Sequence, residues 1–269
     1  MFDKLFELAP SDTFVEALQL KDGKFSSREF IPVREFGKQV WPSDRDCYFS
    51  PAPRLRHGSK KSDVAGSCVL WADVDNAEQP IWLLPPSITV WSGHGWHFYW
   101  LLDKWLTDVE TIENVNKSFE GSDDCWNSNR LLRVPETINW HRGKPEVSKI
   151  AELHWEHKYD ASDIVRVGRI ESKVSNKIRT GDRRGFRSRS ERDWYVVKYL
   201  VKAGLSDELI TKLFELHEIG DKLLEEGGDH YLKHTITMAR ESVASGDKVG
   251  GETGSKVVAD PTTGDLLVA

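Results

Sequence analysis

The spacing of apolar residues changes along the chain, from short strand-like runs before about residue 160 to helical spacing after residue 190. Residues 14–19 and 25–30 flank Asp22-Gly23, a dipeptide typical of a tight hairpin turn. Residues 68–74 form a near-continuous apolar stretch, which is typical of a buried strand. Residues 88–91 and 96–102 predict two strands around a Gly-rich turn. Residues 109–119 predict a helix, and residues 130–134 predict a strand that ends before Pro135. This mixture predicts an α+β domain with a central sheet.

The second half of the chain begins with a stretch that is poor in apolar residues. Residues 171–192 contain eight basic and three acidic side chains, which gives them a net charge of +5. We expect an Arg-rich linker over residues 166–189, with a solvated connector as the simplest interpretation of its composition.

Helical spacing then predicts a small helical domain over residues 190–245. Ser190 offers an N-cap with Asp193 three residues later, Ser206 starts a second helix, and residues 231–243 form a third. Residues 246–269 are rich in Gly, Thr and Asp, and we expect a disordered tail there. The first domain accordingly covers residues 1–165.

Composition narrows the possible classes of protein. Of 269 residues, 39% are hydrophobic and 30% charged, an ordinary soluble balance, and no apolar run approaches the roughly 20 residues that cross a bilayer. The N-terminus lacks the pattern of a secretory signal, so we expect a cytoplasmic protein without membrane contact. The net charge of −6 argues against a wholly basic nucleic-acid binder, although a net charge does not reveal local basic patches. Three distant cysteines without a C-x-x-C pair disfavour a disulfide framework or a cysteine-rich zinc site.

Two acids follow each other closely at the end of the predicted buried strand. Alternation along a strand puts Asp73 and Asp75 on one face, about 6 to 7 Å apart at the backbone. Like charges that close repel, and a divalent cation is the usual reason to keep them together. Alone the pair is weak evidence, because exposed strand ends often carry two acids.

Residues 92–97, Ser-Gly-His-Gly-Trp-His, form a glycine-rich turn before an aromatic strand. Glycines let a backbone approach a ligand closely, and successive N–H groups in such a turn can cradle an anion. His97 lies beside the turn, in reach of a bound phosphate. Taken alone, the segment fits a tight hairpin with a half-buried histidine better than it fits a phosphate site.

A third segment, Gly121-Ser122-Asp123-Asp124, adds a further acid that would complete a two-metal site. It is followed by Arg133 and Asn139, whose side chains are suited to binding phosphate or sugar.

In this order the motifs are far more specific than singly. D-x-D at a strand end, S-G-x-G-x-H some 17 residues later, and Gly-x-Asp before R-x-P-x-T-x-N resemble the archaeo-eukaryotic primase superfamily. The resemblance is greatest to the primase-polymerases of phages, plasmids and other mobile elements. It covers residues 45–145, with residues 48–54 and 61–64 similar to the segment before the first motif. Residues 188–208 resemble the small helical domain that often follows the catalytic domain.

The resemblance implies an α+β catalytic core with an RRM-like palm, followed by a helical bundle, that acts as a DNA primase and DNA polymerase. It implies two divalent ions, Mg²⁺ or Mn²⁺, held by Asp73, Asp75 and a third acid. Asp123 fits the Gly-x-Asp register best, with Asp124 adjacent and Asn129 where some relatives carry another acid. The implied nucleotide site comprises Ser92, Gly93, His97, Arg133 and Asn139, with His97 contacting the triphosphate.

The implied partners are a single-stranded DNA template with its primer, and dNTPs or NTPs. No G-x-x-x-x-G-K-[ST] helicase motif occurs in the sequence, so we expect any helicase to be a separate protein or a part of a longer chain. One position departs from the family pattern, because Glu136 replaces the glycine that usually follows Pro135.

Two other functions fit parts of the pattern. A metal-dependent nuclease also needs clustered carboxylates, and His94 with His97, or His154 with His157, offers a histidine pair for such a site. A non-catalytic protein that binds single strands through a sheet and the Arg-rich segment is the other alternative.

Overall fold

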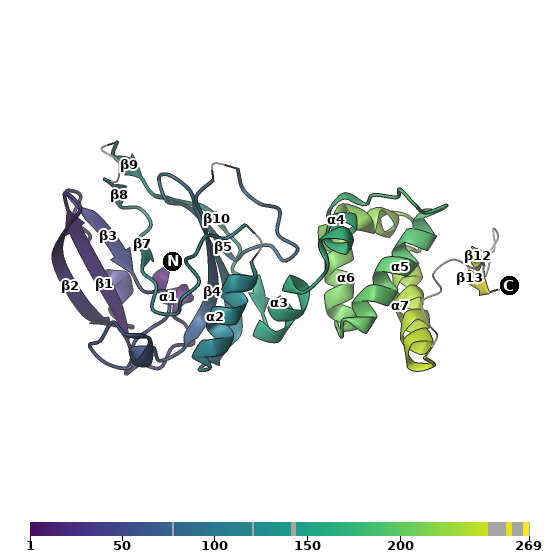
Figure 1. Cartoon of the computed structure of the whole chain (residues 1–269), viewed down its shortest axis with the longest axis horizontal. Coiled ribbons are helices and arrows are strands. Elements are labelled where there is room, and N and C mark those ends of the chain that lie inside the picture. Colours follow the sequence, from purple (N-terminus) through teal and green to yellow (C-terminus); the bar gives the residue numbers. More distant parts are fainter. Residues whose placement is uncertain (77, 120, 141–143, 247–256, 260–265, 269) are drawn as a thin grey trace. The chain divides into compact units, whose positions relative to one another are not determined.

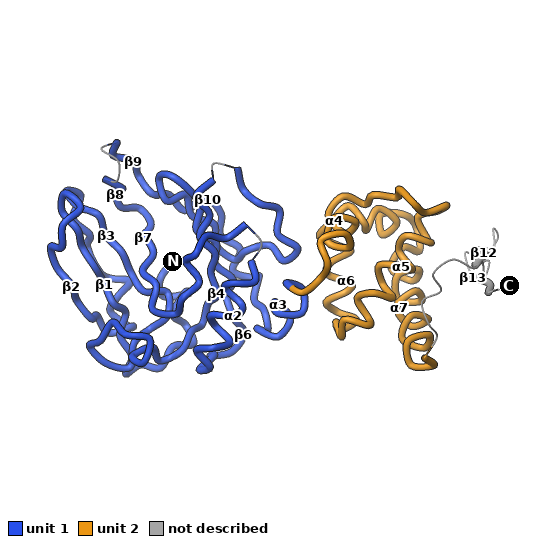
Figure 2. The backbone as a smooth tube through the Cα atoms, viewed as in Figure 1, with its two compact units in different colours: residues 1–168 blue, residues 169–269 orange. Residues whose placement is uncertain are grey.

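The structure, a computed structural model, describes residues 1–76, 78–119, 121–140, 144–246, 257–259 and 266–268. The chain divides into two compact units, residues 1–168 (unit 1) and 169–269 (unit 2), which Figure 2 colours separately. Unit 1 combines antiparallel sheets with helices, and the described part of unit 2 is mainly helical, so the α+β class is confirmed. None of the described helices combines the length and the apolarity that crossing a membrane requires.

The first sheet of unit 1 has four antiparallel strands in the order β2-β1-β3-β7. Asp22 and Gly23 have φ values of 51° and 72°, the left-handed conformation that a two-residue hairpin turn requires, so the predicted turn is confirmed. The predicted strand over residues 130–134 is shorter than expected, because Arg130 belongs to a turn closed by its N–H on Asn127 O. The strands are β1 (Phe14–Lys21), β2 (Lys24–Pro32), β3 (Asp46–Phe49) and β7 (Leu132–Arg133).

The second sheet is built around one long strand. β6 pairs with β4 along one edge, and with β5 and then β11 along the other, while β10 pairs with β5. All these pairs are antiparallel except β11 with β6. Three of these strands occupy the segments that the apolar pattern predicted. The strands are β4 (Ser67–Val74), β5 (Ile88–Trp91), β6 (Trp96–Leu106), β10 (Lys149–Leu153) and β11 (Lys158–Tyr159).

Short elements complete unit 1. Helix α2 packs on β4 (Figure 1). At this contact the side chain of Asn116 accepts a hydrogen bond from the backbone N–H of Trp71. A small hairpin, β8 with β9, follows β7. The remaining elements are α1 (Phe2–Leu5), η1 (Phe36–Lys38), η2 (Lys61–Asp63), α2 (Val109–Ser118), β8 (Ile138–Asn139), β9 (Glu146–Val147) and α3 (Ala161–Gly168).

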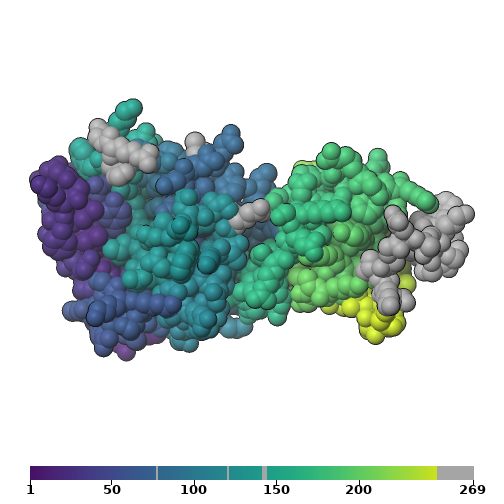
Figure 3. Space-filling view, in the orientation of Figure 1, coloured from purple at the N-terminus to yellow at the C-terminus, as the bar shows by residue number. Residues whose placement is uncertain are grey.

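Aromatic side chains form much of the core of unit 1. Phe49 of the first sheet contacts Tyr99 of the second, with ring centroids 6.4 Å apart, so the two sheets share a core. Trp71 and Trp100 are fully buried, as expected for tryptophans in a sheet. In the space-filling view, side chains of residues 1–168 fill most of the space between the ribbons of Figure 1 (Figure 3).

The described part of unit 2 contains the three predicted helices, one further α-helix and one 3-10 helix. The predicted starts near Ser206 and residue 231 correspond to α6 and α7, and Ser206 Oγ accepts the N–H of Leu209 as an N-cap does. The first predicted cap is wrong, because Ser188 rather than Ser190 accepts the N–H of Glu191 and starts α5. The elements are α4 (Ser172–Thr180), α5 (Arg189–Lys202), α6 (Asp207–Leu216), η4 (Glu218–Leu224) and α7 (Gly228–Ala244).

The predicted linker over residues 166–189 is partly helical. Helix α4 lies inside it because Val174 and Ile178, four residues apart, are both fully buried in unit 2. The predicted disordered tail falls mostly outside the described residues. Two segments within it are described, β12 (Val257–Ala259) and β13 (Leu266–Val268), and they pair with each other.

Candidate active site

Three carboxylates from two segments of the chain come together at one end of the second sheet. Asp73 lies near the end of β4 opposite His97 of β6, and Asp75 follows the strand. Asp123 reaches the pair from the loop after α2. One carboxylate oxygen from each of the three lies within 4.8 Å of the others. The structure therefore places together the three acids that the sequence singled out.

Backbone hydrogen bonds fix the third acid in place. The N–H of Asp123 donates to Asp73 O at 2.8 Å, and the N–H of Asp75 donates to Asp123 Oδ2 at 2.6 Å. Asp124 is not part of the carboxylate group, and its carbonyl accepts a hydrogen bond from Arg130. These two bonds distinguish Asp123 from Asp124, as the Gly-x-Asp register also does.

The three carboxylates form an unbalanced negative cluster. Within the described ranges, no Lys or Arg forms an ion pair with any of them, and the one pairing is with His97. Partial burial raises the pKa of Asp123, and the charges of Asp75, Asp73 and Asp124 raise it further. A divalent cation would relieve this repulsion, and an all-oxygen donor set fits Mg²⁺ or Mn²⁺. The residues present thus fit the implied metal ions.

His97 is buried beside this cluster. Its Nε2 lies 3.5 Å from Asp73 Oδ1, and only 6% of its side chain is exposed. Burial lowers the pKa of His97 and so favours the neutral imidazole, while the nearby negative charge of Asp73 opposes this shift. Its Nδ1 has no hydrogen-bond partner among the described residues, although a buried ring nitrogen normally has one.

The glycine-rich turn approaches protein backbone closely. A Cβ on Gly95 would lie 2.4 Å from Val74 O, and Gly93 has a φ of 103° with Asn139 3.0 Å from its Cβ position. These glycines let the turn pack against the Asp75 end of β4 and against Asn139. The N–H of Ser92 donates to Gly95 O inside the turn, so it is not available for the predicted anion cradle.

The opposite wall of the site comes from the first sheet. Arg133 is buried, donates to Asp46 Oδ1 at 2.7 Å and to the Tyr48 hydroxyl at 2.9 Å, and stacks 4.8 Å from the centre of the Tyr48 ring. Asn139 donates from Nδ2 to Ser92 O at 2.8 Å and so ties this wall to the turn. Asp46 and Tyr48 were not among the predicted site residues, although their spacing on β3 places both on one face.

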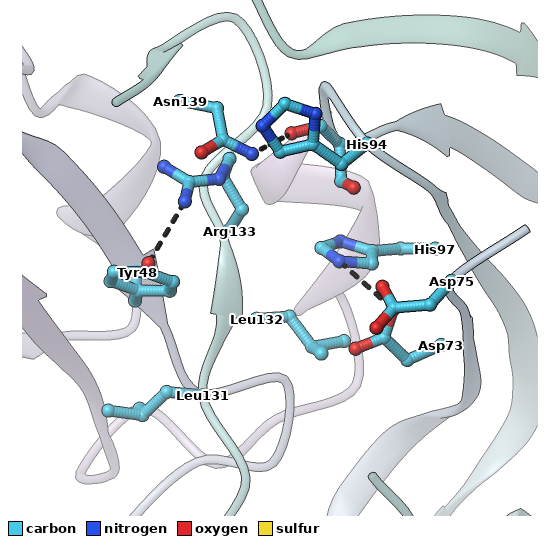
Figure 4. Close-up of a pocket in the computed structure, with 10 residues that line it drawn as sticks. Tyr48, Asp73, Asp75, His94, His97, Leu131, Leu132, Arg133 and Asn139 are labelled. Carbon is cyan, nitrogen blue, oxygen red and sulfur yellow. Dashed lines mark hydrogen bonds and ion pairs between the residues drawn. The ribbon is translucent and has the colours of Figure 1, made fainter. Parts of the chain in front are cut away.

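These groups surround a pocket of about 230 Å³ between the two sheets. Figure 4 shows Asp73, Asp75 and His97 on one side, and Arg133 against Tyr48 on the other. His94 lines the same pocket but does not join the carboxylate group. The pocket is lined by Tyr48, Asp73, Asp75, Ser92, His94, His97, Leu131, Leu132, Arg133 and Asn139.

Glu136, which replaces the usual glycine of the motif, has a φ of 65°. This left-handed conformation favours glycine and strains other residues. The turn therefore keeps the conformation that suits glycine while carrying a glutamate, whose N–H donates to Ser148 O at 3.0 Å.

No family model matches the sequence, and no curated protein matches it either.

Three solved structures are similar to the fold. The archaeo-eukaryotic primase (AEP) domain of the primase-polymerase of cyanophage S-2L has a TM-score of 0.45 at 16% identity, over 61% of this chain and 93% of that one. The primase RepB′ has a TM-score of 0.45 at 14% identity, over 90% and 97%. The catalytic domain of RepB′ in complex with initiator DNA has a TM-score of 0.44 at 11% identity, over 65% and 95%. All three are structures of a primase or a primase-polymerase.

Proposed function

We propose that this protein is a template-directed nucleotidyltransferase, a DNA primase and polymerase that serves the replication of a phage, plasmid or other mobile element. The observation that carries the proposal is the convergence of Asp73, Asp75 and Asp123 beside His97 at a pocket between two sheets. The order of the motifs that supply these residues supports the same function. Its catalytic core would be an RRM-like palm.

The carboxylates supply the negative charge that the chemistry requires. When bound, two Mg²⁺ or Mn²⁺ ions lower the pKa of the attacking 3′-hydroxyl and neutralise the triphosphate and the leaving pyrophosphate. Asp73, Asp75 and Asp123 would hold these ions. The backbone bonds between Asp123 and the other two keep the three carboxylates at fixed spacing before any ligand binds, so little reorganisation is needed.

The other pocket residues would position the nucleotide. A neutral His97 can donate a hydrogen bond to a phosphate oxygen, and it does not need to act as a base. Ser92 and Gly93 would lie along the nucleotide, with Arg133 and Asn139 on the facing wall. Because the charge of Arg133 is balanced by Asp46, the pocket lining is negative overall. We therefore expect a triphosphate to bind only together with divalent cations.

Unit 2 would assist initiation. Starting a strand requires a template and two nucleotides without a duplex to hold them, so an additional binding surface matters most at that step. The Arg-rich segment supplies Arg183 and Arg187 as exposed cations suited to template phosphates. The simpler alternative is that unit 2 only adds stability. A separate helicase would open the template, and we place the protein in the cytoplasm of the host.

One assay separates this proposal from its alternatives. The chain is incubated with a primed template, dNTPs and Mg²⁺ or Mn²⁺. Extension of the primer supports a polymerase, shortening indicates the metal-dependent nuclease, and a shifted but intact strand indicates a binding protein.

Asp73→Ala and Asp75→Ala test the site in the same assay. Each is expected to lower extension by at least about 100-fold while the fold remains intact. Asp103→Ala, which removes an exposed acid of β6, is the matched control and should extend at the wild-type rate. Substantial extension by both site variants would contradict the proposal.

His97→Ala tests the assignment of the histidine. We expect it to weaken dNTP binding more than Mn²⁺ binding, because the imidazole contacts phosphate and not metal. Titrations of each ligand measure the two affinities separately. Unchanged dNTP affinity would remove His97 from the nucleotide site.

A further inference from the structure

A second group of metal-ligand side chains lies in unit 1, outside the pocket. His154, Glu156 and His157 occupy the loop between β10 and β11, and one nitrogen or oxygen atom from each lies within 4.8 Å of the others. The two imidazole rings stack with centroids 4.9 Å apart. Glu156 Oε1 lies 3.4 Å from His154 Nδ1 and 3.8 Å from His157 Nε2. One carboxylate oxygen is therefore close to a nitrogen of each ring.

A buried residue holds both histidines at this spacing. The N–H of His154 donates to Ser87 O at 2.8 Å, and Ser87 Oγ donates to His157 O. Ser87 is itself fully buried, and its Oγ accepts the N–H of Leu101 of β6. The distance between the histidines is thus fixed from the sheet, and a ligand that uses both need not order the loop first.

The orientation of His157 suits metal binding. Its Nδ1 lies 3.4 Å from Pro86 O, so a proton on Nδ1 can be donated to that carbonyl. This tautomer leaves the lone pair of Nε2 on the side of Glu156, and a backbone carbonyl commonly orients metal-binding histidines in this way. The His157 side chain is 19% exposed and that of His154 41%, so an ion can enter from solvent.

We propose that His154, Glu156 and His157 bind a transition-metal ion, with Zn²⁺ as the preferred ion. Two imidazole nitrogens and one carboxylate are a ligand set that Zn²⁺ accepts, with a fourth position left for water. The same set disfavours Mg²⁺, which prefers oxygen ligands. The two clusters of unit 1 thus differ in chemistry, since the carboxylate triad offers oxygen only.

The ion would stabilise the loop between β10 and β11. The loop joins β10, which pairs with β5, to β11, which pairs with β6, and Ser87 precedes β5. Fixing this loop would hold the connection against the edge of the sheet. Ion pairing with the exposed Glu152 and Glu156 is the alternative use of His154, whose Nε2 lies 3.7 Å from Glu152 Oε2.

Co²⁺ is the probe for the test, added to the full metal-free chain. Co²⁺ in a four-coordinate site with nitrogen ligands absorbs strongly in the visible, whereas Co²⁺ in a six-coordinate oxygen site absorbs weakly. We expect strong absorption that saturates at one Co²⁺ per chain, disappears when Zn²⁺ is added and persists in excess Mg²⁺. Asp73→Asn should retain it.

His157→Gln should lower the Co²⁺ affinity by at least about tenfold, since even residues that only orient a ligand cost 10- to 100-fold. His230→Gln, at an exposed position of α7, is the matched control and should bind as the wild type does. Circular dichroism of the metal-free variants checks folding. If His157→Gln does not fold, Glu156→Gln is tested instead, because the Glu156 side chain is 70% exposed. It should also lower the Co²⁺ affinity by at least about tenfold.

Weak absorption in the wild type would overturn the proposal. So would absorption that survives His157→Gln in a folded protein, or that disappears in Asp73→Asn, which would place the ion at the carboxylate triad. Because the readout is absorption by a bound metal and not DNA synthesis, failure here leaves the proposed polymerase function unaffected.

Discussion

Asp193 of unit 2 and Asp73 of unit 1 both lie in groups of charged side chains, and the two groups differ in balance. Asp193 is 1% exposed and bonds to Arg192, whose guanidinium also reaches Asp221 and the carbonyls of Gly181 and Ile219. Asp73 is grouped with two further carboxylates, and in the described part of the chain no Arg or Lys pairs with them.

In unit 2, opposite charges balance each other and stabilise the fold. In unit 1, like charges lie together and are suited to binding a cation. Burial raises the pKa of Asp193, and the adjacent Arg192 opposes that rise. Burial also raises the pKa of Asp123, but there the neighbouring carboxylates add to the rise. Removing a charge should therefore cost stability in unit 2 and function in unit 1.

The largest expected effect is on the stability of unit 2. Arg192→Ala would leave the buried Asp193 without its cation, and we expect a loss of about 3–5 kcal/mol in the free energy of unfolding. Urea unfolding followed by circular dichroism measures it. Arg184→Ala removes an exposed partner of Asp182, with 88% of the Arg184 side chain exposed, and should cost about 0–1 kcal/mol. Equal losses in the two variants would contradict the contrast.

The second effect is on catalysis in unit 1. Asp123→Asn is expected to lower primer extension by about 100- to 1000-fold, because it removes a metal-site charge, and to leave metal-free stability unchanged or higher. The amide oxygen can still accept the N–H of Asp75. Asp124→Asn is the matched control and should remain active. An inactive Asp124→Asn with an active Asp123→Asn would show that the third acid is misassigned.

A third effect compares the two units directly. A chain that ends after residue 168 should extend a primer but lose most unprimed synthesis, because the additional template-binding surface is gone. Both activities are assayed on the truncated and the whole chain, with circular dichroism to check folding. Unprimed synthesis at the level of the whole chain by a folded truncated protein would exclude a role of unit 2 in priming.

The smallest effect concerns the strained turn beside the pocket. Glu136→Gly should raise the free energy of unfolding by up to about 1 kcal/mol, because glycine relieves the left-handed strain at the cost of some chain entropy. Thermal unfolding measures the change. Glu136→Ala keeps the strain and should give no gain. A similar gain in both variants would assign the effect to the glutamate charge instead.

The sequence predicted the elements best where the local signal was strong. Asp22-Gly23 marked its hairpin because both residues tolerate positive φ, and the apolar run of β4 marked a strand buried on both faces. Prediction was poorer in the Arg-rich segment, where α4 has only two buried apolar residues, Val174 and Ile178, among polar and charged ones. Such a helix is stabilised by a few apolar side chains on one face, and the overall composition of the segment does not reveal them.

The sequence by itself determined which residues carry the candidate chemistry, because D-x-D, the glycine turn and Gly-x-Asp are each local patterns. Strand alternation also predicted that Asp73 and Asp75 lie close together, as their carboxylates do. Only the tertiary structure brought Asp123 to them, through hydrogen bonds across 48 residues or more of chain. It also pairs Arg133 with Asp46 across 87 residues of chain. The backbones of His154 and His157 both form hydrogen bonds with Ser87. Such contacts depend on how strands pair and loops close, which no local pattern encodes.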